Sequence, residues 1–93
     1  RYHEGDVVSG VDINKLIEGI VEKLRFEASA QEMEIETELA PLYHIQVDSV
    51  LMNRVISNLI ENAIKYSGRG KSIQVKTWDD AQWVYVEIRD NGI

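Results

Sequence analysis

The sequence contains no cysteine, so a disulfide, a zinc–thiolate site and a cysteine nucleophile are all excluded. It contains no apolar run close to the roughly 18 to 20 residues that a membrane-spanning helix needs. Basic residues are scarce, because 10 Lys and Arg stand against 16 Asp and Glu and the formal net charge is −6. We therefore expect no binding of nucleic acid, since contact with phosphates calls for a basic patch.

The chain has 93 residues, which allows one small domain. Hydrophobic residues make up 44% and charged residues 28%, an ordinary balance for a soluble globular chain that excludes simple disorder. Residues 1–10 are polar and lack a lasting periodicity, so we predict a linker or tail there and a domain over residues 11–93.

Two long helices are predicted from apolar residues that recur at helical spacing. The first spans roughly residues 12–30, and the carboxylate of Asp12 is suited to cap its free backbone N–H groups. The second begins at Asp48 or Ser49 and ends near Gly68, which supplies a left-handed stop. The apolar stripe of this second helix comprises Met52, Val55, Ile56, Leu59, Ile60, Ala63 and Ile64.

Four strands are predicted from the alternation of apolar and polar residues with period two. They span residues 34–39, 43–47, 73–77 and 84–88. The last two are expected to form an antiparallel hairpin because their connection is short. The order helix, strand, strand, helix, strand, strand predicts an α/β (α+β) fold, a two-layer sandwich with helices on one face of a mixed sheet.

The second helix also carries a polar face opposite its apolar stripe. A solvated helix surface is the simpler interpretation of such a face. Asparagine is a poor helix former, however, so two asparagines four residues apart favour a function. An amide oxygen beside an ammonium group suits a phosphate–magnesium pair, because the amide completes a shell of hard oxygen ligands and the lysine offsets phosphate charge. At about 100° per residue, the face comprises Arg54, Asn58, Glu61, Asn62 and Lys65.

A second unusual feature is Asp90, which continues the last strand and is followed by Asn and Gly. Strand parity places it on the same face as Val86 and Ile88, where a buried carboxylate is costly unless it is hydrogen-bonded. One interpretation is an Asx turn at the end of the strand. The other is a carboxylate directed into a pocket between sheet and helix, where it accepts a hydrogen bond from a ligand amino group and Gly92 allows close approach.

Residues 58–67, Asn-Leu-Ile-Glu-Asn-Ala-Ile-Lys-Tyr-Ser, resemble the N box of sensor histidine kinases. Residues 90–93, Asp-Asn-Gly-Ile, resemble the start of the first glycine box of that family. The order of predicted elements over residues 11–93 is similar to the family's order as well. Related ATPases of the gyrase, heat-shock chaperone and mismatch-repair group usually carry Glu at the position of Asn58, so the resemblance favours the kinases. It implies their Bergerat-type ATP-binding fold in an incomplete form.

The resemblance implies a role for each matching residue of the second helix. Asn62 would coordinate Mg²⁺ through its amide oxygen, and Asn58 would lie beside the phosphates or the water shell of the metal. Lys65 would contact phosphate. Tyr66 would line the nucleotide near the ribose and phosphates. The implied cofactors are therefore ATP and Mg²⁺.

The resemblance also implies the remaining contacts and the reaction. Asp90 would accept a hydrogen bond from the adenine amino group, and Gly92 would let the purine approach the backbone. The parent protein would transfer the γ-phosphoryl group of Mg-ATP to a histidine on a separate dimerisation domain of the same protein. The phosphoryl group would then pass to an aspartate of a response regulator, which is the second implied partner.

The match to the family is incomplete at both ends. The chain stops inside the first glycine box, and the ATP lid and the phosphoacceptor helices of the family are absent. His3-Glu4 lacks the proline that follows in the family's phosphoacceptor pattern, so we expect no catalytic residue in this chain. We expect the isolated chain to be inactive. Because a sheet edge and some apolar surface would be exposed, we expect it either to self-associate or to be the ordered piece of a longer protein. Many relatives are membrane-anchored with this domain in the cytoplasm, so the resemblance implies a cytoplasmic domain of a parent that can be anchored.

Two alternatives remain beside the kinase interpretation: an ATPase of the same superfamily, and a non-catalytic fragment or interaction module. Two surface features bear on the last of these. Trp78 and Trp83 are interpreted as packing on the sheet, because the acidic charge argues against stacking on nucleic-acid bases. The run Glu32, Glu34, Glu36, Glu38 is interpreted as a solvated face, with a surface for a basic partner as the alternative.

Overall fold

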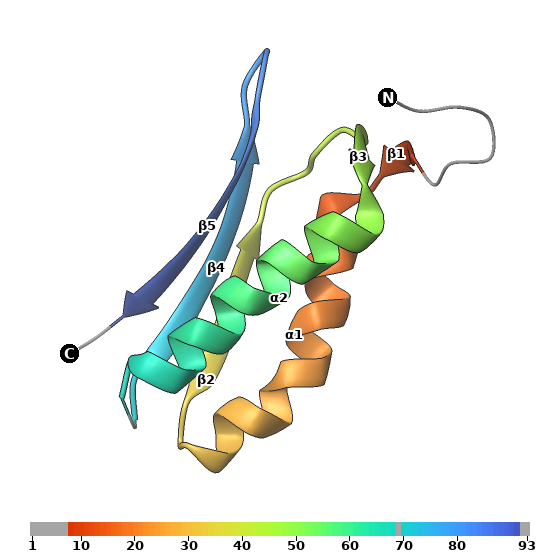
Figure 1. The fold of residues 1–93 in the computed structure, drawn as a ribbon. Coiled ribbons are helices and arrows are strands. Elements are labelled where there is room, and N and C mark those ends of the chain that lie inside the picture. Colours follow the sequence, from red (N-terminus) through yellow and green to blue (C-terminus); the bar gives the residue numbers. More distant parts are fainter. Residues whose placement is uncertain (1–7, 69, 92–93) are drawn as a thin grey trace.

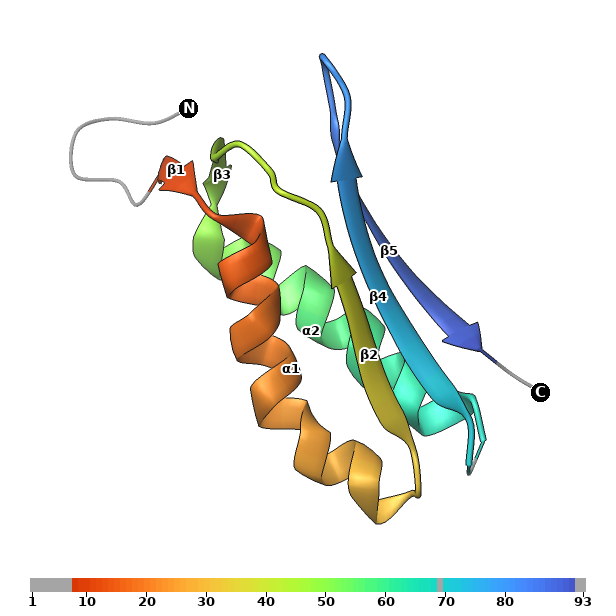
Figure 2. The same cartoon turned by 180° about the vertical axis from the view of Figure 1, so that it is seen from behind.

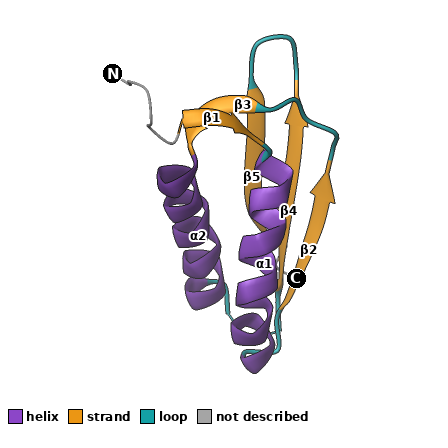
Figure 3. Cartoon of the chain, turned by 90° about the vertical axis from the view of Figure 1, so that its right-hand side faces the viewer, coloured by secondary structure: helices purple, strands orange, loops and turns teal. Residues whose placement is uncertain are grey.

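The computed structural model describes residues 8–68 and 70–91. Helices α1 (Ile13–Ala30) and α2 (Ser49–Tyr66) lie side by side against one face of a sheet (Figure 1; Figure 3). The predicted two-layer α/β sandwich is therefore confirmed. The strands are β1 (Val8–Val11), β2 (Glu34–Leu39), β3 (Ile45–Asp48), β4 (Ser72–Asp79) and β5 (Val84–Asn91).

The main sheet has three strands in the order β2-β4-β5. β2 runs parallel to β4, and Ile35 pairs with Ile73. β4 runs antiparallel to β5, and Ile73 pairs with Asp90. The mixed sheet and the antiparallel final hairpin are thus as predicted. α2 lies in the connection between the parallel strands and packs on the same face as α1 (Figure 2).

The predicted second strand does not join this sheet. It begins at Ile45 rather than at Tyr43, and it pairs antiparallel with β1 in a separate two-stranded sheet beside the start of both helices. β1 itself lies where the sequence predicted the end of a polar tail, so that prediction was wrong for residues 8–10. The pairing of Val11 with Ile45 explains the difference, because a backbone partner distant in the sequence orders a short segment that has little periodicity of its own.

Both helices begin at a capping aspartate: Asp12, as predicted, and Asp48, which was one of the two candidates for the second helix. The Oδ1 atom of Asp12 accepts a hydrogen bond of 3.1 Å from the backbone N–H of Lys15. The Oδ1 atom of Asp48 accepts bonds of 3.0 and 3.1 Å from the backbone N–H groups of Val50 and Leu51. α2 is followed by Gly68 at φ +102°, a left-handed conformation that an L side chain rarely adopts.

The hydrophobic core lies between the two helices and the inner face of the main sheet. Each helix contributes a stripe of buried side chains at helical spacing, and β4 contributes alternate residues. Neither helix is long and apolar enough to cross a membrane within the part of the chain that the structure describes. The largest fully buried apolar side chains are Ile13, Ile17, Val21, Ile60, Ile64, Ile73 and Val75.

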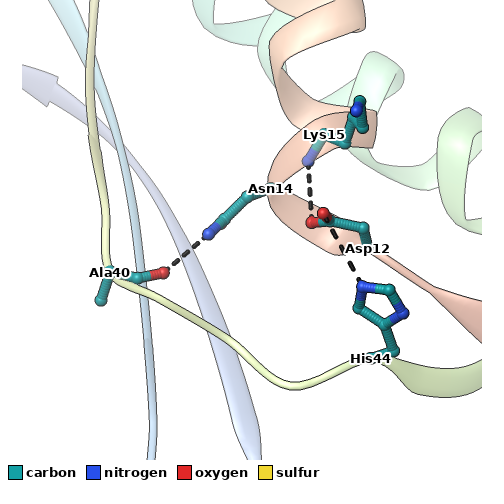
Figure 4. A network of polar contacts seen from close by, with 5 residues as sticks. All are labelled: Asp12, Asn14, Lys15, Ala40 and His44. Carbon is teal, nitrogen blue, oxygen red and sulfur yellow. Dashed lines mark hydrogen bonds and ion pairs between the residues drawn. The ribbon is translucent and has the colours of Figure 1, made fainter.

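A polar network joins the start of α1 to the sheet. Thr77, which is only 1% exposed, donates from its hydroxyl to Oδ1 of Asn14 at 2.8 Å. The Nδ2 atom of Asn14 donates to the backbone carbonyl of Ala40 at 2.6 Å (Figure 4). Both ends of the Asn14 amide are therefore used, and α1, β4 and the segment after β2 are held at one point. Beside it, the exposed His44 lies with Nε2 3.8 Å from Oδ2 of Asp12.

Candidate functional site

The polar face predicted for α2 is present and open to solvent. Asn58, Glu61, Asn62 and Lys65 are all exposed, whereas Ile60 on the opposite side of the helix is fully buried. The face results from the helical period, because the buried positions Ile56, Ile60 and Ile64 leave the intervening positions free. The first requirement of the predicted site, a set of exposed amide and ammonium groups on one helix face, is therefore met.

Part of this face borders a hollow between the two helices. The hollow has a volume of about 450 Å³ and is open to solvent. Asn62 and Lys65 line it together with Glu61, so an amide, an ammonium and a carboxylate meet in one place. Such a set offers hard oxygen donors beside a single cation. Its other lining residues are Glu27, Gln31 and Ile64.

Glu27 and Gln31 are lining residues that the sequence reasoning missed. They lie four positions apart at the end of α1, so they share one side of that helix. The spacing was visible in the sequence. What the sequence did not supply is the packing of α1 beside α2, which carries these side chains to the edge of the predicted site.

Asn58 and Tyr66 are exposed on α2 but do not line this hollow. Nζ of Lys65 lies 5.4 Å from the centroid of the Tyr66 ring, within the range of a cation–π contact. The end of α2 therefore presents an ammonium group and an aromatic ring next to each other, both accessible to a ligand.

Asp90 has the parity that the sequence predicted. It pairs with the fully buried Ile73 on β4, so it belongs to the face of the sheet that carries the helices. Asp90 itself is exposed, however, and the expected burial of its carboxylate was wrong. The physical reason is that β5 is the outer strand of the three-stranded sheet, so its last residues have no neighbouring strand on one side.

Asp90 and the polar end of α2 lie at the same end of the molecule. Figures 1 and 2 both show the C-terminal end of β5 beside the C-terminal turns of α2. Asp90 does not line the hollow that holds Asn62 and Lys65. The two predicted constellations therefore share one end of the fold without meeting in a single pocket. Gly92 lies outside the described residues, as does His3.

One flank of α2 differs from the prediction. Val55 and Leu59 were assigned to the apolar stripe of the core, yet both are exposed. They lie four residues apart on the side of α2 opposite to Ser57 and Glu61, which border a pocket shared with α1. The core accepts only the central part of the apolar stripe, because three strands leave this flank uncovered.

The donor groups of the described residues limit how a metal could be held. Across residues 8–68 and 70–91, no three His, Cys, Asp or Glu side chains gather closely enough to bind a metal ion by themselves. An ion at the end of α2 would draw its remaining oxygens from water or from a bound phosphate, which is how proteins commonly hold Mg²⁺. The residues present fit a site in which the protein supplies only part of the ligands.

Comparison with solved structures identifies the class of fold. The chain matches the catalytic domain of the histidine kinase ThkA with a TM-score of 0.85 and 20% identity, covering 92% of this chain and 60% of that domain. It matches the mycobacterial sensor histidine kinase MprB with a TM-score of 0.80 and 26% identity, covering 92% of this chain and 56% of MprB. ThkA in complex with the response regulator protein TrrA also matches, with a TM-score of 0.80, 20% identity, and coverage of 87% and 25%. The fold is that of histidine kinase catalytic domains.

The sequence comparison then gives the family. The profile of the family described as "Histidine kinase-, DNA gyrase B-, and HSP90-like ATPase" matches residues 47–93. The chain belongs to this family of ATPase domains. It is also 38% identical over 74 residues to the phytochrome-like protein Cph1 of Synechocystis sp., an alignment that covers 76% of this chain and 9% of Cph1. The chain thus spans only a small part of such a relative.

Proposed function

We propose that this chain is the first part of the ATP-binding domain of a sensor histidine kinase. The observation that carries the proposal is the exposed set Asn62, Lys65 and Glu61 on α2, which stands in the segment resembling the family's N box. Its parent protein would transfer the γ-phosphoryl group of Mg-ATP to a histidine on a separate dimerisation domain. A response regulator would then receive the phosphoryl group, and the solved complex of ThkA with TrrA supports that choice of partner.

In the proposed site each side chain has a physical task. The amide oxygen of Asn62 would supply one hard ligand to Mg²⁺, and the metal would offset the charge of the phosphates. Asn58, one helical turn earlier, contacts the water shell of the metal. The ammonium of Lys65 neutralises phosphate charge, and the Tyr66 ring beside it borders the ribose. Asp90 would accept a hydrogen bond from the adenine amino group, and the lack of a side chain at Gly92 would leave room for the purine.

The chemistry asked of these residues is positioning and charge neutralisation rather than covalent catalysis. Asp90 would hold the base, and Asn62 and Lys65 would hold the phosphates. No residue of this chain accepts the phosphoryl group in this proposal. The isolated chain is therefore expected to bind nucleotide and to leave it intact, whereas turnover of ATP without a histidine acceptor would favour an ATPase of the same superfamily.

The test is a titration of the chain with Mg-ADP, followed by amide NMR or calorimetry. We expect saturable binding with shifts at the end of α2. Asp90→Asn is expected to weaken binding about ten- to a hundredfold, because a hydrogen bond to a charged group contributes about 1.5–3 kcal/mol.

The matched control is Glu87→Gln, the same carboxylate-to-amide change on the same strand but on the opposite face of the sheet. It is expected to leave nucleotide affinity unchanged. No saturable shift up to millimolar Mg-ADP, or equal effects of the two substitutions, would contradict the assignment of Asp90.

A further inference from the structure

An aromatic surface lies on the side of the molecule away from the nucleotide site. It consists of Tyr43, Trp78, Trp83 and Tyr85, here called the aromatic surface. Trp78 and Tyr85 point to the outer face of the sheet, because their neighbours Thr77 and Val86 belong to the inner face. Both helices cover only the inner face (Figure 3). The sequence suggested that the tryptophans pack on the sheet, and for Trp83 this was wrong.

The side chains of the aromatic surface are unusually exposed to solvent. Trp83 is 63% exposed, Tyr43 is 46% exposed and Trp78 is 38% exposed. A single exposed aromatic residue would need no explanation. Several together form an accessible patch of the residue types most enriched at protein interfaces. Trp78, Trp83 and Tyr85 belong to the hairpin of β4 and β5, whose tip projects beyond the rest of the sheet (Figure 1).

One carboxylate ties the backbone of the hairpin tip to the Tyr85 side chain. Asp80 accepts hydrogen bonds of 2.8 Å from the backbone N–H groups of Gln82 and Trp83, and one of 2.6 Å from the hydroxyl of Tyr85. The N–H of Asp80 donates to the carbonyl of Trp83 at 3.0 Å, so the backbone of Trp83 is tied on both sides. The hydroxyl of Tyr43 donates to the carbonyl of Asp80 at 3.4 Å.

The rings themselves are also ordered. Trp78 and Tyr85 stack with their centroids 5.2 Å apart and their planes 14° apart. The hydrogen bond from Tyr85 lowers the pKa of Asp80, with the two backbone N–H groups adding to the effect. The Asp80 carboxylate is therefore charged at neutral pH, where it accepts these hydrogen bonds. A partner that binds here meets a pre-organised surface and bears little ordering cost on this side.

The charge around the aromatic surface selects the partner. Next to it on the outer face, Lys76 pairs in register with Glu38 on one side and with Glu87 on the other. Glu34 and Glu36 continue the outer face of β2 and are exposed, while Arg89 is a second exposed cation on the outer face of β5. Carboxylates outnumber cations on this face, and the whole chain carries a formal charge of −6.

We propose that the aromatic surface binds a basic segment of a separate protein. Arginine or lysine side chains of that segment lie over the faces of Trp83 and Trp78, where the ring quadrupole attracts a cation. Other cations of the same segment meet Glu38 and Glu87 on the adjoining strands. The aromatic rings and the carboxylates thus both favour the same kind of ligand, a segment rich in cationic side chains. The inference does not depend on nucleotide binding, since it uses the opposite face of the sheet.

The test uses a tetra-arginine peptide, acetylated and amidated, as the probe. The chain has two tryptophans and both belong to the aromatic surface, so intrinsic fluorescence reports binding directly. We expect a saturable change of tryptophan emission with tetra-arginine and none with a tetra-glutamate peptide. Amide NMR shifts are expected at residues 78–85 and at the outer face of β2.

Two kinds of variant separate the contributions, with affinity measured by NMR where a tryptophan is replaced. Trp83→Leu keeps an apolar side chain but removes the π face, and it is expected to weaken binding about three- to tenfold. The double variant Glu38→Gln/Glu87→Gln is expected to weaken binding as well, and more so at low salt. Its matched control is Glu18→Gln/Glu22→Gln, which removes the same charge from the exposed side of α1 and is expected to have little effect.

Several results would overturn the proposal. Unchanged affinity in Trp83→Leu, with an intact amide spectrum, would exclude a cation over this ring. Equal losses of affinity in the two double variants would show that the peptide responds only to the net charge of the chain. Emission that changes with protein concentration in the absence of peptide would assign the surface to a second copy of the chain.

Discussion

Replacing Thr77 by valine is expected to destabilise the domain although the side chain keeps its shape. The substitution removes the hydroxyl that donates to Oδ1 of Asn14 at 2.8 Å. Asn14 is partly buried, so its carbonyl oxygen is left without a protein donor and with limited access to water. An unsatisfied buried acceptor costs about 1–3 kcal/mol, and the partial exposure of Asn14 places the expected loss at about 1–2 kcal/mol.

Asn14→Ala is expected to cost more, about 2–3 kcal/mol. It leaves the hydroxyl of Thr77, which is 1% exposed, without an acceptor and the carbonyl of Ala40 without its 2.6 Å bond. For a domain of this size each 1 kcal/mol lowers Tm by about 4–8 °C. Because the two residues share one hydrogen bond, the double variant is expected to lose less than the sum of the single losses.

Thermal and urea unfolding of the four proteins in this cycle measure the coupling. The control is Thr37→Val, the same chemical change at an exposed position of β2, expected to stay within about 0.5 kcal/mol of the parent. Additive losses within about 0.3 kcal/mol, or equal effects at Thr77 and Thr37, would refute the role assigned to the network.

Other expectations concern a cap, a titrating pair and an apolar flank. Asp48→Ala removes the N-cap of α2 and is expected to cost about 1 kcal/mol in urea unfolding, whereas an unchanged midpoint would contradict the capping role. Tyr85→Phe removes the main contact that lowers the pKa of Asp80, so an NMR titration should show that pKa rise, and a fixed value would argue against it. Because folding lowers the pKa of Asp80, its ionised carboxylate stabilises the folded chain at pH values above the pKa of the unfolded state. This stabilisation is lost as the pH falls through the pKa of the folded state, and in Tyr85→Phe the loss is expected at a higher pH. Val55→Ser/Leu59→Ser is expected to reduce self-association as measured by light scattering. Equal association of the variant and the parent chain, or a parent chain that is already monomeric, would contradict that expectation.

The elements that could be predicted from the sequence are those with strong local signals. α1 and α2 carry buried isoleucines at helical spacing between an aspartate cap and a stop, so both were placed within a residue or two. The parity of Asp90 followed from the alternation of β5 in the same way. Apolar spacing and capping residues are local features of a short stretch of sequence. They predict the structure correctly here because the tertiary contacts of these elements agree with them.

The elements that escaped prediction depend on partners distant in the sequence. β1 exists because Val11 has Ile45 beside it, and no window around Val11 contains that information. The exposure of Leu59 depends on how many strands lie under α2 rather than on the pattern of α2 itself. Glu27 joins the edge of the candidate site through helix packing. In each case the missing quantity is a tertiary contact, which periodicity does not encode.

The parallel pairing of β2 with β4 has a consequence for how the chain folds. Glu36 and Gln74, which face each other across these strands, are 38 residues apart, whereas β4 and β5 are joined by a short loop. Closing the longer loop costs chain entropy before any contact offsets it, so we expect the hairpin to form early and β2 to dock late. Substitutions at Ile35 would then accelerate unfolding while leaving the folding rate nearly unchanged, and a slowed folding rate would contradict this order. The segment joining α1 to β2 would be the first to open in the native state, and hydrogen exchange would detect that opening before the hairpin is lost.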